Sequence, residues 1–143
     1  MVDTKKYSID LTVLGVVPFI LGAVFLQMHI PYYAYVKMLF LQYGLLIFSF
    51  VMGSYWGIAL SDSSRLSSVV AFISNGLLLL VWLGGYLLPY AAALGSLGLL
   101  FWFVLPCDYY FYNHGKISYS YFRYRIGISI VVGLCLNLVA WSL

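Results

Sequence analysis

The residue types that usually carry chemistry are scarce in this sequence of 143 residues, which has two histidines, two cysteines, four aspartates and no glutamate. The membrane spans predicted below place His29 and His114 at opposite membrane faces, so the two cannot share a metal or flank one haem. Cys107 and Cys135 are expected at depths about 14 Å apart, too far for a disulfide. We therefore predict no metal site, no cofactor and, since no catalytic motif is found, no enzymatic activity.

Apart from Gln42 and Asn137 in the other half of the membrane, the polar side chains singled out within the predicted spans gather in one layer near one membrane face. At 1.5 Å per residue they fall roughly 6–13 Å from that face. One interpretation is that they form hydrogen bonds between helices. The other is that they line an inward-facing pocket for a lipid headgroup or a small anion. The residues of this candidate polar pocket are Ser54, Tyr55, Ser74, Asn75 and Ser129.

Charged residues are expected at the edge of the same layer, where they would form an ionic rim. Asp108 comes at the end of one predicted helix, and Arg123 and Arg125 precede another at the same face. One arginine fork can bind a carboxylate through two hydrogen bonds, so we predict that Asp108 pairs with Arg123 or Arg125. The alternative is that Asp108 is solvated and both arginines face lipid phosphates. The full candidate rim is Asp62, Arg65, Asp108, Arg123 and Arg125.

The composition defines the elements that must position these groups. The sequence is 64% hydrophobic and only 8% charged, with a mean hydropathy of +1.01. A soluble enzyme, a DNA-binding domain and a disordered linker are excluded, because so few charges cannot cover the surface of a soluble protein. Apolar runs of about 20 residues predict membrane-spanning helices. The predicted fold is all-α, a single transmembrane domain over residues 1–143 with helices at about 9–28, 38–60, 66–86, 89–106 and 126–143.

The distribution of Lys and Arg predicts the orientation of these five spans. Six basic residues fall on one face and only Lys37 on the other, so the N-terminus is expected inside and the C-terminus outside. The net charge of +3 then reflects topology and gives no reason to expect nucleic-acid binding. The six residues are Lys5, Lys6, Arg65, Lys116, Arg123 and Arg125.

Two further segments have distinctive compositions. Residues 108–125 are rich in Tyr and Phe and are predicted to form a loop lying on the inner membrane surface, beside anionic lipid. Ser49, Gly53 and Gly57 are spaced four apart on the second predicted helix, which is typical of close helix packing. Gly22 has no partner at this spacing and is expected to lie outside such a tight face.

The second predicted helix resembles the signature helix of a family of small five-helix membrane proteins of unknown function that includes transmembrane protein 69. The resemblance spans essentially the whole chain and implies an inner-membrane location and no known activity. It adds Trp56 to the packing motif, and it departs from the family at Tyr55, where many members carry a basic or imidazole residue. The matching residues are Tyr43, Gly44, Ser49, Phe50, Gly53, Trp56, Gly57 and Ala59, then Asp108, and then Tyr121, Phe122, Arg123, Arg125 and Ser129.

These patterns favour a non-enzymatic integral membrane protein with an accessory, assembly or scaffold role. Its expected partners are the lipid bilayer, with anionic lipid at the inner face, and either another membrane protein or further copies of itself. The alternative is a small transporter or a lipid- or anion-binding carrier that uses the inner polar layer. Ion-coupled transport usually needs an ionisable residue within the spans, and the predicted spans contain none. The expected location is a bacterial inner membrane or a mitochondrial inner membrane.

Overall fold

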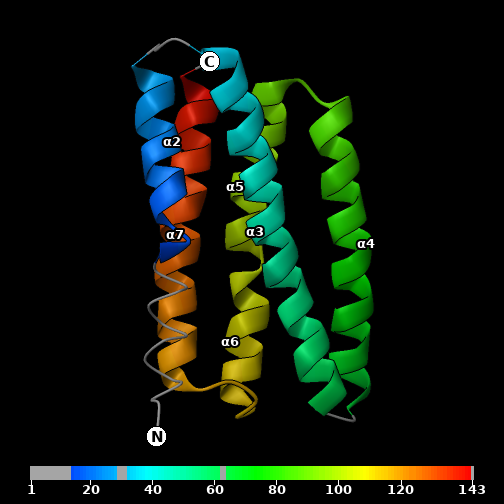
Figure 1. Cartoon of the computed structure of the whole chain (residues 1–143). Coiled ribbons are helices and arrows are strands. Elements are labelled where there is room, and N and C mark those ends of the chain that lie inside the picture. The colour runs from blue at the N-terminus through cyan, green and yellow to red at the C-terminus, as the bar shows by residue number, and fades with distance from the viewer. Residues whose placement is uncertain (1–13, 29–31, 62–63, 143) are drawn as a thin grey trace, which may run out of the picture.

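The computed structural model describes residues 14–28, 32–61 and 64–142, and within these ranges the regular structure consists of helices joined by short turns, without strands. Figure 1 shows the helices as a bundle of roughly parallel rods. The helices are α2 (Val17–Gln27), α3 (Tyr33–Ser61), α4 (Arg65–Leu87), α5 (Tyr90–Phe103), α6 (Leu105–Asn113) and α7 (Tyr119–Trp141).

Four of the helical stretches are long and apolar enough to cross a membrane: α3, α4, α7 and the continuous stretch of α5 and α6, Tyr90–Asn113. The shortest of these has 23 residues, or about 34 Å, which exceeds the hydrocarbon core of about 30 Å. These lengths and compositions indicate a membrane location. Helix α2 has 11 residues, and the start of the run predicted at 9–28 lies outside the described residues. The first predicted span, 9–28, is therefore not described in full.

Serine caps and a glycine turn set the ends of the helices near the candidate site. The Oγ atom of Ser64 accepts a hydrogen bond from the amide of Ser67 at 3.3 Å, which caps the N-terminus of α4. Ser118 caps α7 in the same way, through the amide of Tyr121 at 3.3 Å. Gly115 has a φ of +69° in the turn between α6 and α7, a conformation that glycine adopts without steric strain.

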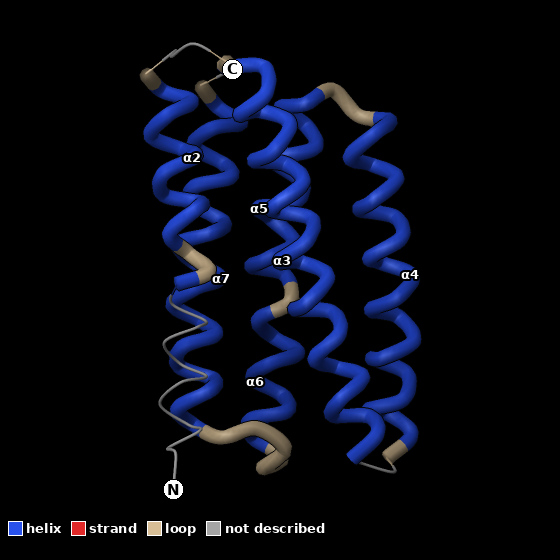
Figure 2. The backbone as a smooth tube through the Cα atoms, in the orientation of Figure 1, coloured by secondary structure: helices blue, strands red, loops and turns tan. Residues whose placement is uncertain are grey.

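The prediction that residues 108–125 form a surface loop is wrong, because most of them are helical. The fourth span does not end at Pro106 but continues as α6 to Asn113, and α7 begins at Tyr119. Pro106 occupies the first turn of α6, where its missing N–H leaves no hydrogen bond unmade. Only a short break near Val104 separates α5 from α6, as Figure 2 shows. Helix α3 likewise begins at Tyr33, earlier than predicted.

The closest helix packing occurs between α5 and α7, around two glycines. A Cβ atom added at Gly133 would collide with the indole ring of Trp102, and one added at Gly98 would collide with the Asn137 carboxamide. The Trp102 indole N–H donates to the carbonyl of Ser129 at 3.1 Å. The Trp102 indole thus occupies the space that a side chain at position 133 would need. Helices α5 and α7 can approach closely at this point because glycine has no side chain.

The predicted packing motif on α3 is wrong. Nothing lies within 4 Å of a Cβ atom added at Gly53 or Gly57, and Trp56 is 40% exposed. Spacing identified a row of small residues but not the face of the helix that meets a neighbour. The α3 glycine in tight contact is Gly44, whose added Cβ would lie 2.9 Å from Leu97. The expectation that Gly22 lies outside a tight face is also wrong, because a Cβ atom added there, on α2, would collide with the Phe40 ring.

Candidate functional site

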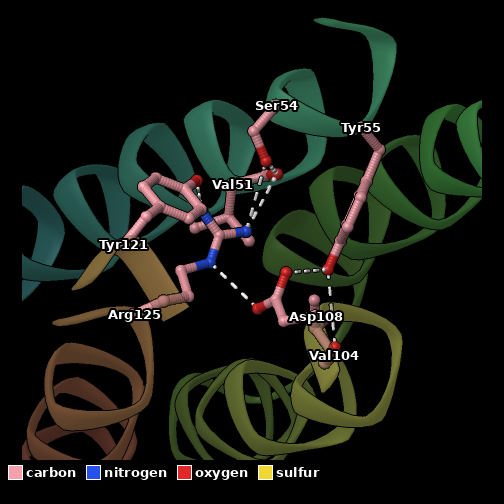
Figure 3. Close-up of polar contacts among 7 residues, drawn as sticks. All are labelled: Val51, Ser54, Tyr55, Val104, Asp108, Tyr121 and Arg125. Carbon is pink, nitrogen blue, oxygen red and sulfur yellow. Dashed lines mark hydrogen bonds and ion pairs between the residues drawn. The ribbon is translucent and has the colours of Figure 1, made fainter. Parts of the chain in front are cut away.

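Three helices meet at a buried ion pair. Arg125 of α7 donates from Nε to Oδ2 of Asp108 on α6 at 3.1 Å. The hydroxyl of Tyr55, from α3, donates to the other carboxylate oxygen of Asp108, Oδ1, at 2.9 Å. Figure 3 shows the three side chains converging from their separate helices. The predicted pairing of Asp108 is therefore made with Arg125.

The guanidinium of Arg125 also binds groups on two helices. Its Nη1 atom donates to the Tyr121 hydroxyl at 3.0 Å, one turn earlier on α7. Its Nη2 atom donates to the Val51 carbonyl at 3.2 Å and approaches Ser54 Oγ at 3.4 Å, both on α3. All three guanidinium nitrogens thus have partners within the chain (Figure 3). We call this set of seven residues the clamp: Val51, Ser54, Tyr55, Val104, Asp108, Tyr121 and Arg125.

The break between α5 and α6 places the carboxylate. The Val104 carbonyl accepts the amides of Cys107 at 3.0 Å and Asp108 at 3.3 Å, which starts the new helix. Asp108 therefore sits in the first turn of α6, where the helix dipole favours a negative charge. The Tyr55 hydroxyl lies 3.4 Å from the same carbonyl, but its single hydrogen is assigned to the nearer Asp108 oxygen.

The ion pair lies inside the helical spans and is shielded from solvent. The side chain of Asp108 is 3% exposed and that of Arg125 is 11% exposed. Asp108 is about 8 Å along the helix from Asn113, at 1.5 Å per residue. The prediction that the spans contain no ionisable residue is therefore wrong, because α6 and α7 extend past the predicted boundaries. A buried charge within a span needs an oppositely charged partner, and Asp108 and Arg125 are partners for each other.

The five residues of the predicted polar pocket are not brought together. Ser54 and Tyr55 belong to the clamp, whereas Ser74 is buried and donates to the Ala71 carbonyl of its own helix at 2.7 Å. Ser129 is buried, and Asn75 is exposed on the outside of α4. Their similar predicted depths were not enough to predict a shared site, because depth does not specify the direction of a side chain.

The predicted ionic rim reduces to one pair among the described residues. Arg65 and Arg123 are exposed, and neither has an ion-pair partner in the part of the chain that the structure describes. Asp62 lies outside the described residues. Sequence reasoning also missed three clamp members: the Val51 carbonyl, the Val104 carbonyl and the Tyr121 hydroxyl. Tyr121 and Arg125 are four residues apart, a spacing that brings side chains together on a helix but means nothing in a loop.

A cavity of about 380 Å³ adjoins the clamp. It lies between the end of α3 and the start of α7, and two clamp residues, Ser54 and Tyr121, form part of its wall. It is open to the outside of the bundle, and among the described residues its lining carries hydroxyl groups but no charge. Its lining residues are Ser54, Gly57, Ile58, Ser61, Ile117, Ser118 and Tyr121.

Four long apolar helical stretches, two of them joined by a buried ion pair, indicate a helical membrane protein. The chain belongs to a family described as "Protein of unknown function (DUF3429)", whose model matches residues 4–141. This agrees with the resemblance to a family of unknown function drawn from the second predicted helix. No curated protein and no solved structure matches the chain.

Proposed function

We propose that this protein is a non-enzymatic integral membrane protein that acts by helix packing, as an accessory, assembly or scaffold component. The observation that carries this proposal is that the charged groups of the clamp bind groups within the bundle. The buried charged groups, Asp108 and Arg125, bind each other and their neighbours on α3 and α7. Groups used in this way hold the bundle in one arrangement, and these two charges are therefore not free for a reaction.

The proposed setting is an inner membrane, bacterial or mitochondrial, with the N-terminus inside. Arg65 at the start of α4 and Arg123 near the start of α7 are exposed at one end of the bundle. Figure 1 shows the starts of these two helices at the same end. Exposed arginines at the membrane surface suit anionic lipid headgroups. This end is the one proposed to face inward.

The test is isolation of the full chain in a mild detergent, followed by mass spectrometry of bound proteins and lipids together. A stoichiometric membrane-protein partner, or a stable assembly of copies, supports the packing role. A chain that stays monomeric and retains one lipid or small molecule in stoichiometric amount would contradict it.

A second candidate function is that of a small lipid- or anion-binding carrier. One observation favours it: the cavity beside the clamp. Filling the cavity separates the two functions. Gly57 lines the cavity and has nothing within 4 Å of an added Cβ, so Gly57→Leu should fill the space without disturbing the bundle. Gly53→Leu is the matched control, because Gly53 is equally open but does not line the cavity. Loss of a retained lipid in the Gly57 variant alone would support the carrier.

A further inference from the structure

Asn75 is a polar side chain in the middle of a span, turned away from the protein. It is the eleventh of the 23 residues of α4 and is exposed. Its carboxamide makes no hydrogen bond within the described part of the chain. In the hydrocarbon layer there is no water to replace such a bond, so an amide facing lipid is unfavourable. The position therefore indicates a partner from outside the chain.

Asn75 lies in a row of exposed residues that runs along the whole of α4. The intervals between successive members alternate between four and three residues, which is the spacing of the seam in paired helices. The row includes large side chains that remain exposed, among them Phe72 at 78% and Tyr86 at 70%. We call this row the α4 seam: Ser68, Phe72, Asn75, Leu79, Trp82 and Tyr86.

Helix α4 is placed to offer this seam to a neighbour. It is the least buried of the four spans and packs mainly against α3. Figure 1 shows it at the outer edge of the bundle. Its buried residues, Ser67, Ala71 and Ser74, form a different stripe, which faces the bundle. The seam residues are thus exposed along the length of α4, on a different face from this buried stripe.

We propose that the α4 seam binds the α4 seam of a second copy, with the two Asn75 carboxamides hydrogen-bonded to each other. A carboxamide has both donors and an acceptor, so it is complementary to itself. Copies of a membrane protein share one orientation, so a two-fold axis along the membrane normal sets Asn75 opposite Asn75 at the same depth. A different partner would have to supply a matching polar group at that depth. This inference rests on the proposed packing function and names its partner.

Disulfide cross-linking between copies in vesicles tests the proposal, with the native Cys107 and Cys135 changed to Ala. Leu79→Cys places a thiol on the seam, and Leu80→Cys places one on the neighbouring face, about 100° around the helix. The two leucines have similar exposure, at 61% and 68%, which makes them a matched pair. The full chain is reconstituted in phosphatidylcholine–phosphatidylglycerol vesicles at low protein-to-lipid ratio, so that random collisions are rare.

The expected result is a cross-linked dimer with Leu79→Cys and about tenfold less with Leu80→Cys. Adding Asn75→Leu to the Leu79→Cys chain should weaken association about tenfold, whereas Asn75→Gln should preserve it. Because Asn75 is exposed and its carboxamide makes no hydrogen bond within the described part of its own chain, thermal stability of the monomer should be unchanged in both. Equal cross-linking at the two leucines, or no effect of Asn75→Leu, would overturn the proposal. If the Leu79→Cys chain forms no dimer in these vesicles while the full chain isolated in mild detergent retains a different membrane protein, the second copy is overturned as partner and the packing function stands.

Discussion

Nε of Arg125 lies 3.1 Å from Oδ2 of Asp108, although the two residues are 17 apart in the sequence and belong to different spans. The ion pair joins α6 to α7 above the turn that connects them. Tyr55 and Val51 extend the contact to α3. The pair therefore fixes the positions of three helices with one internally neutral set of side chains, which suits a low-dielectric environment.

The first prediction is that Asp108 and Arg125 are energetically coupled. Asp108→Asn or Arg125→Gln leaves one buried charge without its partner, so each should lower the free energy of unfolding by about 3–5 kcal/mol. Unfolding of the single and double variants in mild detergent micelles gives the coupling energy, expected at about 0.5–3 kcal/mol. Arg123→Gln is the matched control on α7 and should change stability by less than about 0.5 kcal/mol, since Arg123 is exposed. Additive effects of Asp108→Asn and Arg125→Gln would mean that the pair does not hold the helices.

The second prediction concerns the Tyr55 hydroxyl. Tyr55→Phe keeps the ring, which packs 5.8 Å from the Phe111 ring, but removes the donor to Asp108 Oδ1. The buried carboxylate then loses one of its two side-chain partners, and we expect a loss of about 1–3 kcal/mol in the same unfolding measurement. Tyr124→Phe provides the comparison, because Tyr124 is 40% exposed and lies outside the clamp. Equal effects of the two changes would show that the hydroxyl of Tyr55 contributes nothing specific.

The third prediction concerns the contact between α5 and α7. Gly133→Ala forces the added methyl group against the Trp102 indole, whose N–H is held by Ser129, and should destabilise the bundle by about 1–3 kcal/mol. Gly127→Ala on the same helix meets nothing within 4 Å and should be neutral or stabilising, since alanine favours helices by about 1 kcal/mol over glycine. Thermal unfolding of the two variants side by side checks this. The reverse order of stability would show that the two helices do not meet at Gly133.

The sequence predicts the helical class and the centres of the spans, because long apolar runs in lipid have one favourable backbone conformation. The predicted end of the fourth span and the predicted start of the fifth were wrong. Two sequence signals had been used to end a helix there, a proline and a polar stretch, and neither ends a helix in the structure. Pro106 lies where a helix can begin, and the Tyr-rich residues on both sides of Gly115 are polar enough to resemble a surface loop. Reading that stretch as a loop placed Asp108 and Arg125 at the membrane surface and so concealed the clamp.

The contacts between helices were less predictable than the helices themselves. The pairing of Asp108 was predicted because helix ends at the same face must meet, and opposite charges there attract. The role of Tyr55 as its donor, and the fit of Trp102 over Gly133, depend on how each helix is rotated about its axis. Nearly every face of a membrane helix is apolar, so hydrophobic periodicity carries little information about that rotation.

The last prediction concerns orientation, which follows from the charges at the two ends of the described bundle. Arg65 and Arg123 lie at the end where α4 and α7 begin, and Lys37 lies near the start of α3 at the other. The positive-inside rule then places the turn after Asn113 inside and the turn at Leu88 outside. In a chain with Cys107 and Cys135 changed to Ala and expressed in a bacterial inner membrane, Leu88→Cys should react with a membrane-impermeant maleimide in intact cells. Asn113→Cys should react only after the cells are opened, because its turn faces the cytoplasm. Labelling in the opposite order would reverse the orientation and would place the clamp near the outer surface.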